Sequence, residues 1–164
     1  MSSSKPHDDS PTEISLREIS RYVRSGVRST QEVVTYLRRH GVPPTHAARL
    51  VTEYRAKGLL DDRASARLWA EHWARRGYAT AAIRVKLSAK GFDEHVINST
   101  IHQRYPPSDD EERARAVVAQ RVRRTAVRPA RARLARTLAS RGFDSDVIER
   151  ILRNFASQNF SSAE

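Results

Sequence analysis

The sequence predicts an all-α fold made of three tandem three-helix repeats. A Leu-x-x-x-Gly frame recurs three times, at intervals of 50 and 51 residues between the glycines. Apolar residues recur at helical spacing, and no stretch alternates with period two over the length of a strand. A unit of about 50 residues buries only part of its apolar surface, so we expect the repeats to share core along an elongated, curved stack. The three frames are Leu37–Gly41, Leu87–Gly91 and Leu138–Gly142.

The first helix of each unit follows a pair of acidic residues. Asp61–Asp62 and Asp109–Asp110 are placed to cap free N–H groups and to complement the positive end of the helix that follows. Asp8–Asp9 precede the first unit in the same way. We interpret these carboxylates as helix caps and not as catalytic groups.

The second helix of each unit has its own start and stop signals. Ser29 and Glu32 have the spacing of a capping box, Thr80 is a candidate N-cap, and Pro129 suits a first helical turn. A glycine at the end of a helix can adopt the left-handed conformation that terminates it. The sequence therefore predicts that these helices end at Gly41, Gly91 and Gly142.

The third helix restarts within a few residues of the glycine. Asp93 and Asp144 are the predicted N-caps, and Pro43–Thr45 start the corresponding helix of the first unit. The predicted repeats cover residues 11–60, 61–105 and 109–157. The prolines of Tyr105–Ser108 favour an extended link, which we expect to be a hinge.

The charge of the chain is concentrated in one stretch. The 164 residues include 30 Lys and Arg against 19 Asp and Glu, a formal net charge of +11. Residues 113–143 contain ten Arg and no acidic residue. A GC-rich genome would explain a preference for Arg over Lys but not this placement. An acid-free basic stretch indicates a polyanionic partner.

Several classes of chemistry are excluded or disfavoured. The absence of cysteine excludes disulfides, thiolate zinc sites and cysteine nucleophiles. The sequence has no phosphate-binding loop of the Gly-x-x-x-x-Gly-Lys type, and its six histidines lack zinc-ligand spacing. We therefore expect no cofactor, no metal and no enzymatic activity. Without a long apolar run or a signal peptide, we expect a cytoplasmic protein that does not enter a membrane.

The middle unit carries a family resemblance over about 33 residues. The run from Gly58 to Phe92 contains Leu-Asp-Asp, two tryptophans, Arg-Arg-Gly, then Ile and Leu before Lys-Gly-Phe. This pattern resembles the RecX family of bacterial recombination regulators, and looser similarity extends over residues 13–156. The family pattern has Phe where Ser65 stands and Arg near His72 and Trp73. Trp69 and Trp73, four residues apart, are interpreted as core aromatics that also compensate for the missing Phe.

The resemblance implies a regulatory protein and not an enzyme. It implies binding to the RecA nucleoprotein filament and inhibition of its ATPase, strand-exchange and co-protease activities in DNA repair, recombination and the SOS response. We expect a monomer that contacts the filament, and single- or double-stranded DNA is a further candidate partner. The alternative is a basic helical protein that acts directly on DNA. Base stacking requires aromatic side chains among the basic ones, and residues 113–141 contain none.

Helical projection identifies candidate binding residues. With Val118 as the core direction, Arg113 points outward, while Arg115 and Arg121 flank the apolar stripe. A solvated basic face is the alternative interpretation. A passive peptide scaffold would need a large exposed apolar groove, and the sequence shows no surplus of apolar residues for one. The predicted contact set is Arg113, Arg123, Arg124, Arg133 and Arg136. A second set, matching basic positions of the resembling pattern, is Arg75, Arg76, Arg84, Lys86 and Lys90.

Overall fold

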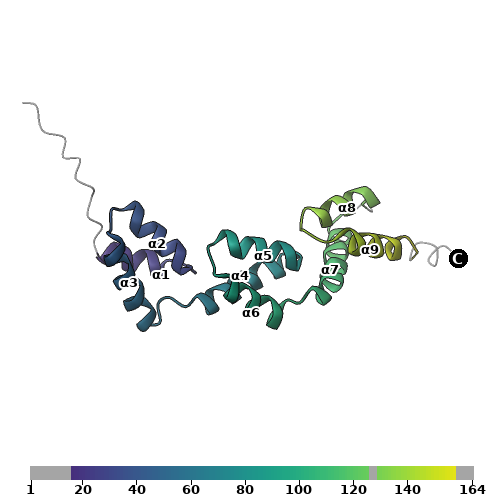
Figure 1. Ribbon diagram of the computed structural model, residues 1–164. Coiled ribbons are helices and arrows are strands. Elements are labelled where there is room, and N and C mark those ends of the chain that lie inside the picture. The colour runs from purple at the N-terminus through teal and green to yellow at the C-terminus, as the bar shows by residue number, and fades with distance from the viewer. Residues whose placement is uncertain (1–15, 126–128, 158–164) are drawn as a thin grey trace, which may run out of the picture. The chain divides into compact units, whose positions relative to one another are not determined.

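The computed structural model describes residues 16–125 and 129–157, and in these ranges all regular structure is helical (Figure 1). Nine α-helices and one short 3-10 helix lie within the described ranges. The helices form three successive sets of three, which confirms the predicted all-α repeat fold. Asp8–Asp9 and residues 11–15 of the predicted first repeat lie outside the described residues, as does Arg128, one of the ten arginines of residues 113–143.

The first repeat consists of α1 (Leu16–Arg24), α2 (Thr30–Arg39) and α3 (Pro44–Ala56). Its core holds Val33 and Leu37 of α2, both fully buried, packed with residues of α1 and α3. The hydroxyls of Ser20 and Tyr54 lie 3.0 Å apart and link α1 to α3.

The second repeat consists of α4 (Asp62–Arg75), α5 (Thr80–Ala89) and α6 (Glu94–Arg104). Ile83 and Leu87 of α5 are fully buried in its core, together with residues of α4 and α6. The rings of Trp69 and Trp73 stack with centroids 5.3 Å apart. Trp73 is buried and Trp69 packs against the same core, so the core interpretation of these tryptophans is confirmed.

The third repeat begins with a short 3-10 helix, η1 (Pro107–Asp109), and continues with α7 (Asp110–Arg123), α8 (Arg131–Ala139) and α9 (Ser145–Ser157). Leu134 and Leu138 of α8 are buried against residues of α7 and α9. The buried side chains of α7 are Ala114, Val117 and Val118, which are small for core residues.

Most of the predicted caps are present. Ser29 and Glu32 form a complete capping box at the start of α2. The carboxylates of Asp93 and Asp144 accept backbone N–H groups in the first turns of α6 and α9, each at 2.8 Å. The glycines that end the second helices have the predicted positive φ, at 74° for Gly41, 77° for Gly91 and 80° for Gly142.

Some of the predicted caps are wrong. The N-cap of α5 is Ala79, so Thr80 is the first helical residue and its side chain is not the cap. Pro129 precedes the N-cap of α8, Ala130, and stands before the first turn. Asp109 is the N-cap of α7 but makes no capping hydrogen bond through its side chain.

By internal packing, the chain divides into two compact units, Met1–Asp62 and Arg63–Glu164. The second unit contains both the second and third repeats. Within it, Ala79 N–H donates to the carbonyl of Arg141 at 3.0 Å, and the Arg141 guanidinium donates to the carbonyl of Arg76 at 2.6 Å. The predicted hinge at Tyr105–Ser108 therefore does not separate the units, because the repeats on either side of it are bonded together.

Candidate partner-binding surface

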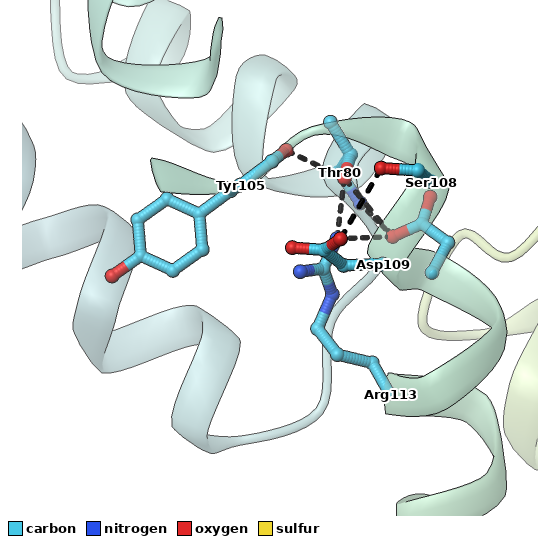
Figure 2. A network of polar contacts seen from close by, with 6 residues as sticks. Thr80, Tyr105, Ser108, Asp109 and Arg113 are labelled. Atoms are coloured by element: carbon cyan, nitrogen blue, oxygen red, sulfur yellow. Dashed lines mark hydrogen bonds and ion pairs between the residues drawn. The ribbon is translucent and has the colours of Figure 1, made fainter. Parts of the chain in front are cut away.

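Polar side chains from two repeats meet where α5 begins (Figure 2). The carboxylate of Asp110 accepts the backbone N–H of Thr80 at 2.9 Å. The hydroxyl of Thr80 lies 3.0 Å from the Tyr105 carbonyl oxygen and 3.0 Å from the same carboxylate, and accepts a hydrogen bond from Arg113. Arg113 also forms an ion pair with Asp110. Asp110 thus caps a helix of the preceding repeat rather than its own.

This network changes the interpretation of Arg113. Its side chain is 15% exposed and that of Asp110 is 14% exposed. The predicted outward orientation of Arg113 is wrong, because the second repeat covers the face of α7 that the projection leaves open. Arg113 therefore links two repeats. Unlike the other four members of its predicted contact set, it is not available at the surface.

Tyr105 lies beside this network and is partly buried. Burial raises the pKa of its phenol above the ordinary value of 10.0, and the neighbouring carboxylate of Glu71 raises it further. The Tyr105 side chain is therefore neutral at physiological pH and contributes packing rather than charge.

Four predicted contact residues of the third repeat are exposed and make no ion pair within residues 16–125 and 129–157. Arg123 lies in the last turn of α7 and Arg124 is its C-cap, where positive charge complements the helix dipole. The other two lie on the exposed side of α8. By contrast, Arg115 pairs with Glu111. The exposed set, called here the arginine set, is Arg123, Arg124, Arg133 and Arg136.

The second predicted set is mostly engaged within its own repeat. Arg84 pairs with Glu94 at 2.8 Å and donates to Asn98. The ammonium group of Lys90 lies 3.9 Å from the ring centroid of Trp69, and that of Lys86 lies 4.5 Å from the ring centroid of Tyr78. These two lysines and the rings beneath them form a cation–aromatic cluster.

The remaining two members of the second predicted set, Arg75 and Arg76, are exposed. Arg75 pairs with Glu71, four residues earlier in α4. The side chain of Arg76 is exposed, and its backbone carbonyl accepts the Arg141 bond between the repeats. A surface pair of this kind contributes little to stability, so Arg75 can be recruited by a partner at low cost.

The described residues provide neither a metal site nor a membrane-spanning helix. Within residues 16–125 and 129–157, no group of three or more His, Asp or Glu side chains is placed to hold a metal ion. Over the same residues, no helix has the length and apolar character needed to span a membrane.

Comparison with known proteins identifies the family. The model of the third three-helix domain of RecX matches residues 105–152. A regulatory protein RecX from Thermobifida fusca is 28% identical over 144 residues, covering 85% of this chain and 75% of that protein. A regulatory protein RecX from Streptomyces coelicolor is 30% identical over 131 residues, covering 77% of this chain and 69% of that protein. The chain belongs to the RecX family.

Solved RecX structures share the fold. The crystal structure of RecX from Lactobacillus salivarius superposes with a TM-score of 0.66 at 18% identity, covering 84% of this chain and 92% of that one. A second crystal structure of a regulatory protein RecX gives a TM-score of 0.62 at 25% identity, covering 82% of this chain and 70% of that one. RecX relatives are named regulatory proteins and not enzymes.

Two features of this RecX-family chain were not found from its sequence. The Asp110 network joins residues 30 positions apart, and no local pattern identifies such a pair. The cation–aromatic cluster carries a weak signal, because Trp69 and Trp73 are four apart on one helix and Lys86 and Lys90 four apart on the next. Only the packing of α4 against α5 brings the two pairs together.

Proposed function

We propose that this RecX-family protein binds the RecA nucleoprotein filament and inhibits its ATPase, strand-exchange and co-protease activities. The observation that carries the proposal is the arginine set in the third repeat, the part of the chain matched by the RecX domain model. Its exposed guanidinium groups are not neutralised by carboxylates of the described residues. They are therefore available to the carboxylates and phosphates of a filament made of protein and DNA.

Inhibition would follow from binding alone. A protein bound along the filament restrains the movement between subunits that ATP turnover and strand exchange require. In this proposal the protein works in the cytoplasm as a monomer, and RecA supplies all of the ATP chemistry. Because cation contacts with phosphate release counterions, binding weakens as the salt concentration rises.

The test is the rate of ATP hydrolysis by RecA on single-stranded DNA, measured with increasing amounts of this protein. We expect the rate to fall as the protein approaches equimolar amounts with RecA. Albumin and lysozyme, one acidic and one basic, serve as controls for crowding and for nonspecific charge. An unchanged rate at equimolar protein, under low-salt conditions, would contradict the proposal.

Direct binding to single-stranded DNA is a second candidate, and the cation–aromatic cluster favours it. Lys90 lies over the Trp69 ring and Lys86 over the Tyr78 ring, so a base stacks on either ring once its lysine moves aside to contact a phosphate. Bases stack on aromatic rings while the backbone phosphates contact lysines, and neither contact requires a particular sequence.

Tryptophan fluorescence tests this candidate, because Trp69 and Trp73 are the two tryptophans of the chain. We expect an unlabelled oligothymidine to quench the fluorescence, and Lys90→Gln to weaken the binding. The recombinase is absent from this experiment, so a positive result does not depend on RecA. Unchanged fluorescence at low salt would exclude base stacking on this cluster.

A further inference from the structure

An open apolar groove lies between α7 and α9 of the third repeat. It has a volume of about 780 Å³, within the range of pockets that hold small ligands or several side chains. Val118 and Ile151 are buried at its floor, while Val122 and Phe155 are half-buried. No surplus of apolar residues in the sequence indicated this groove, because its residues come from two helices about 30 positions apart. We call this hollow the α7/α9 groove.

The corresponding face of the second repeat is smaller and mixes polar with apolar residues. Aligning Ala66 with Ala114 and Ile97 with Ile148 places a hollow of about 420 Å³ at the equivalent position, lined by Ala64, Arg67, Leu68, Glu71, Arg104 and Tyr105. The second repeat thus accommodates Glu71 and Arg104 on this face. Glu71 corresponds to Ala119, Thr100 to Ile151 and Arg104 to Phe155. At these three positions the third repeat is therefore more apolar than the second.

The rim of the groove is basic. Arg115 and Arg123 both line it and lie on α7, eight residues apart. Arg115 pairs with Glu111, whereas Arg123 makes no ion pair within the part of the chain that the structure describes. The end of the groove at Arg123 therefore lacks a negative charge, and an occupant with a carboxylate at that end would be complementary.

We propose that the α7/α9 groove binds a segment of a partner protein that inserts apolar side chains and places a carboxylate beside Arg123. The proposal rests on the proposed function, since the partner in question is RecA in its filament. The apolar floor excludes water from the contact, and the basic rim sets the direction of the bound segment. A nucleic acid has charge but no apolar side chain to fill the floor.

Two variants test the groove while preserving the helices. Ala119→Glu places in the groove the residue type that the second repeat carries at Glu71. A carboxylate there is four residues from both Arg115 and Arg123, a spacing that supports the helix. Val122→Ala removes apolar contact without adding charge. The matched control is Ala116→Glu, an exposed position on the same helix outside the groove.

The measurement is the affinity of the full chain for RecA filaments assembled on single-stranded DNA, with circular dichroism as a check of folding. We expect Ala119→Glu to weaken binding about tenfold or more, because a charge in the groove loses its hydration. Val122→Ala should weaken it about threefold, and Ala116→Glu should bind within about twofold of the unmodified chain. Equal effects of Ala119→Glu and Ala116→Glu would overturn the proposal.

Two other occupants give distinct results. If Ala119→Glu weakens binding to bare oligothymidine as much as binding to the filament, the groove contacts nucleic acid and the proposal is wrong. Residues 158–164, which follow α9, include Phe160. If a chain ending at Ser157 shows shifted methyl signals for Val118, Val122 and Ile151 but binds the filament with unchanged affinity, that tail occupies the groove and the proposal is wrong.

A second measurement separates this proposal from the proposed function. The methyl groups of Val118, Val122 and Ile151 are followed by NMR in the full chain. The probe is a synthetic peptide with Leu at helical spacing and Glu elsewhere. We expect the methyl signals to shift when this peptide is added, and not when a version carrying Lys in place of Glu is added. If the chain fails to bind the filament but these signals shift, the proposed binding to RecA is wrong, whereas the proposal that the groove binds an apolar, acidic segment stands. Unshifted signals overturn the groove proposal.

Discussion

At the residue scale, the carboxylate of Asp110 caps a helix of the preceding repeat and not its own helix. It accepts the N–H of Thr80 at the start of α5, and Asp62 accepts the N–H of Thr30 at the start of α2 at 2.7 Å. In both cases, the aspartate that begins the first helix of one repeat accepts a free backbone N–H at the start of the second helix of the preceding repeat. In the third repeat the position that corresponds to Thr30 and Thr80 is occupied by Arg131.

Removing the Asp110 carboxylate should destabilise the second unit. Asp110→Ala leaves the Arg113 guanidinium nearly buried without its counter-charge, at a cost of about 3 kcal/mol. Glu71→Ala breaks the exposed pair with Arg75 and should cost less than about 1 kcal/mol. Urea unfolding followed by tryptophan fluorescence reports on this unit, because both tryptophans lie in it. Equal midpoints for the two variants would show that the network does not stabilise the unit.

Tyr105 makes the stability of the second unit sensitive to alkaline pH. Because its pKa is raised in the folded state, folding favours the neutral phenol. This contribution is complete below the unfolded pKa of about 10 and is lost as the pH rises through the folded pKa. We expect the difference in urea midpoint between the unmodified chain and Tyr105→Phe to change between pH 8 and pH 11. A constant difference would contradict the assignment.

At the scale of elements, a turn that follows a second helix can also pack closely against a helix of another repeat. Gly142 has a φ of +80°, and a Cβ added there would lie 2.7 Å from the Cβ of Ala82. The glycine is therefore required by the approach of α5 to this turn as well as by its backbone angles. Gly58 has a φ of +66° but no heavy atom within 4 Å of an added Cβ.

These two glycines allow the backbone and packing effects to be separated. Gly58→Ala should cost about 1 kcal/mol from backbone strain alone. Gly142→Ala should cost about 1 to 3 kcal/mol more, because the contact between α5 and the turn must open. Thermal and urea unfolding by circular dichroism would measure both. The packing argument fails if the two substitutions have the same cost.

Element prediction from the sequence succeeded where the signals are local. The glycine stops, the capping box at Ser29 and the aspartate caps of α6 and α9 each involve residues within a few positions of one another. It failed at Thr80 and Arg113, whose partners lie in another repeat. Hydrogen bonds between distant residues depend on helix packing, which no local pattern encodes.

At the scale of the whole molecule, the arginine set is expected to control the strength and the salt dependence of partner binding. Replacing Arg123, Arg124, Arg133 and Arg136 together by Ala should reduce inhibition of RecA, with helicity nearly unchanged. If all four contact DNA phosphates, the slope of log affinity against log salt should become shallower by about 3. The measurement is filament binding across a series of salt concentrations.

A matched control tests whether position or total charge matters. Arg17, Arg21, Arg38 and Arg39 are also exposed, but they lie in the first repeat. Replacing these four by Ala removes the same charge from another part of the chain. Similar losses of inhibition and slope in both variants would indicate a general charge effect rather than a binding site.

The sequence alone determined the helical class, the three repeats, the family resemblance and the concentration of arginine, because all of these reside in local spacing and composition. The tertiary structure alone determined which arginines are exposed, since Arg113 is enclosed by the repeat before its own while Arg123 is not. It also produced the α7/α9 groove from residues about 30 positions apart. The physical reason is that burial is a property of packed surfaces, and a helical pattern specifies only one of the two surfaces in each contact.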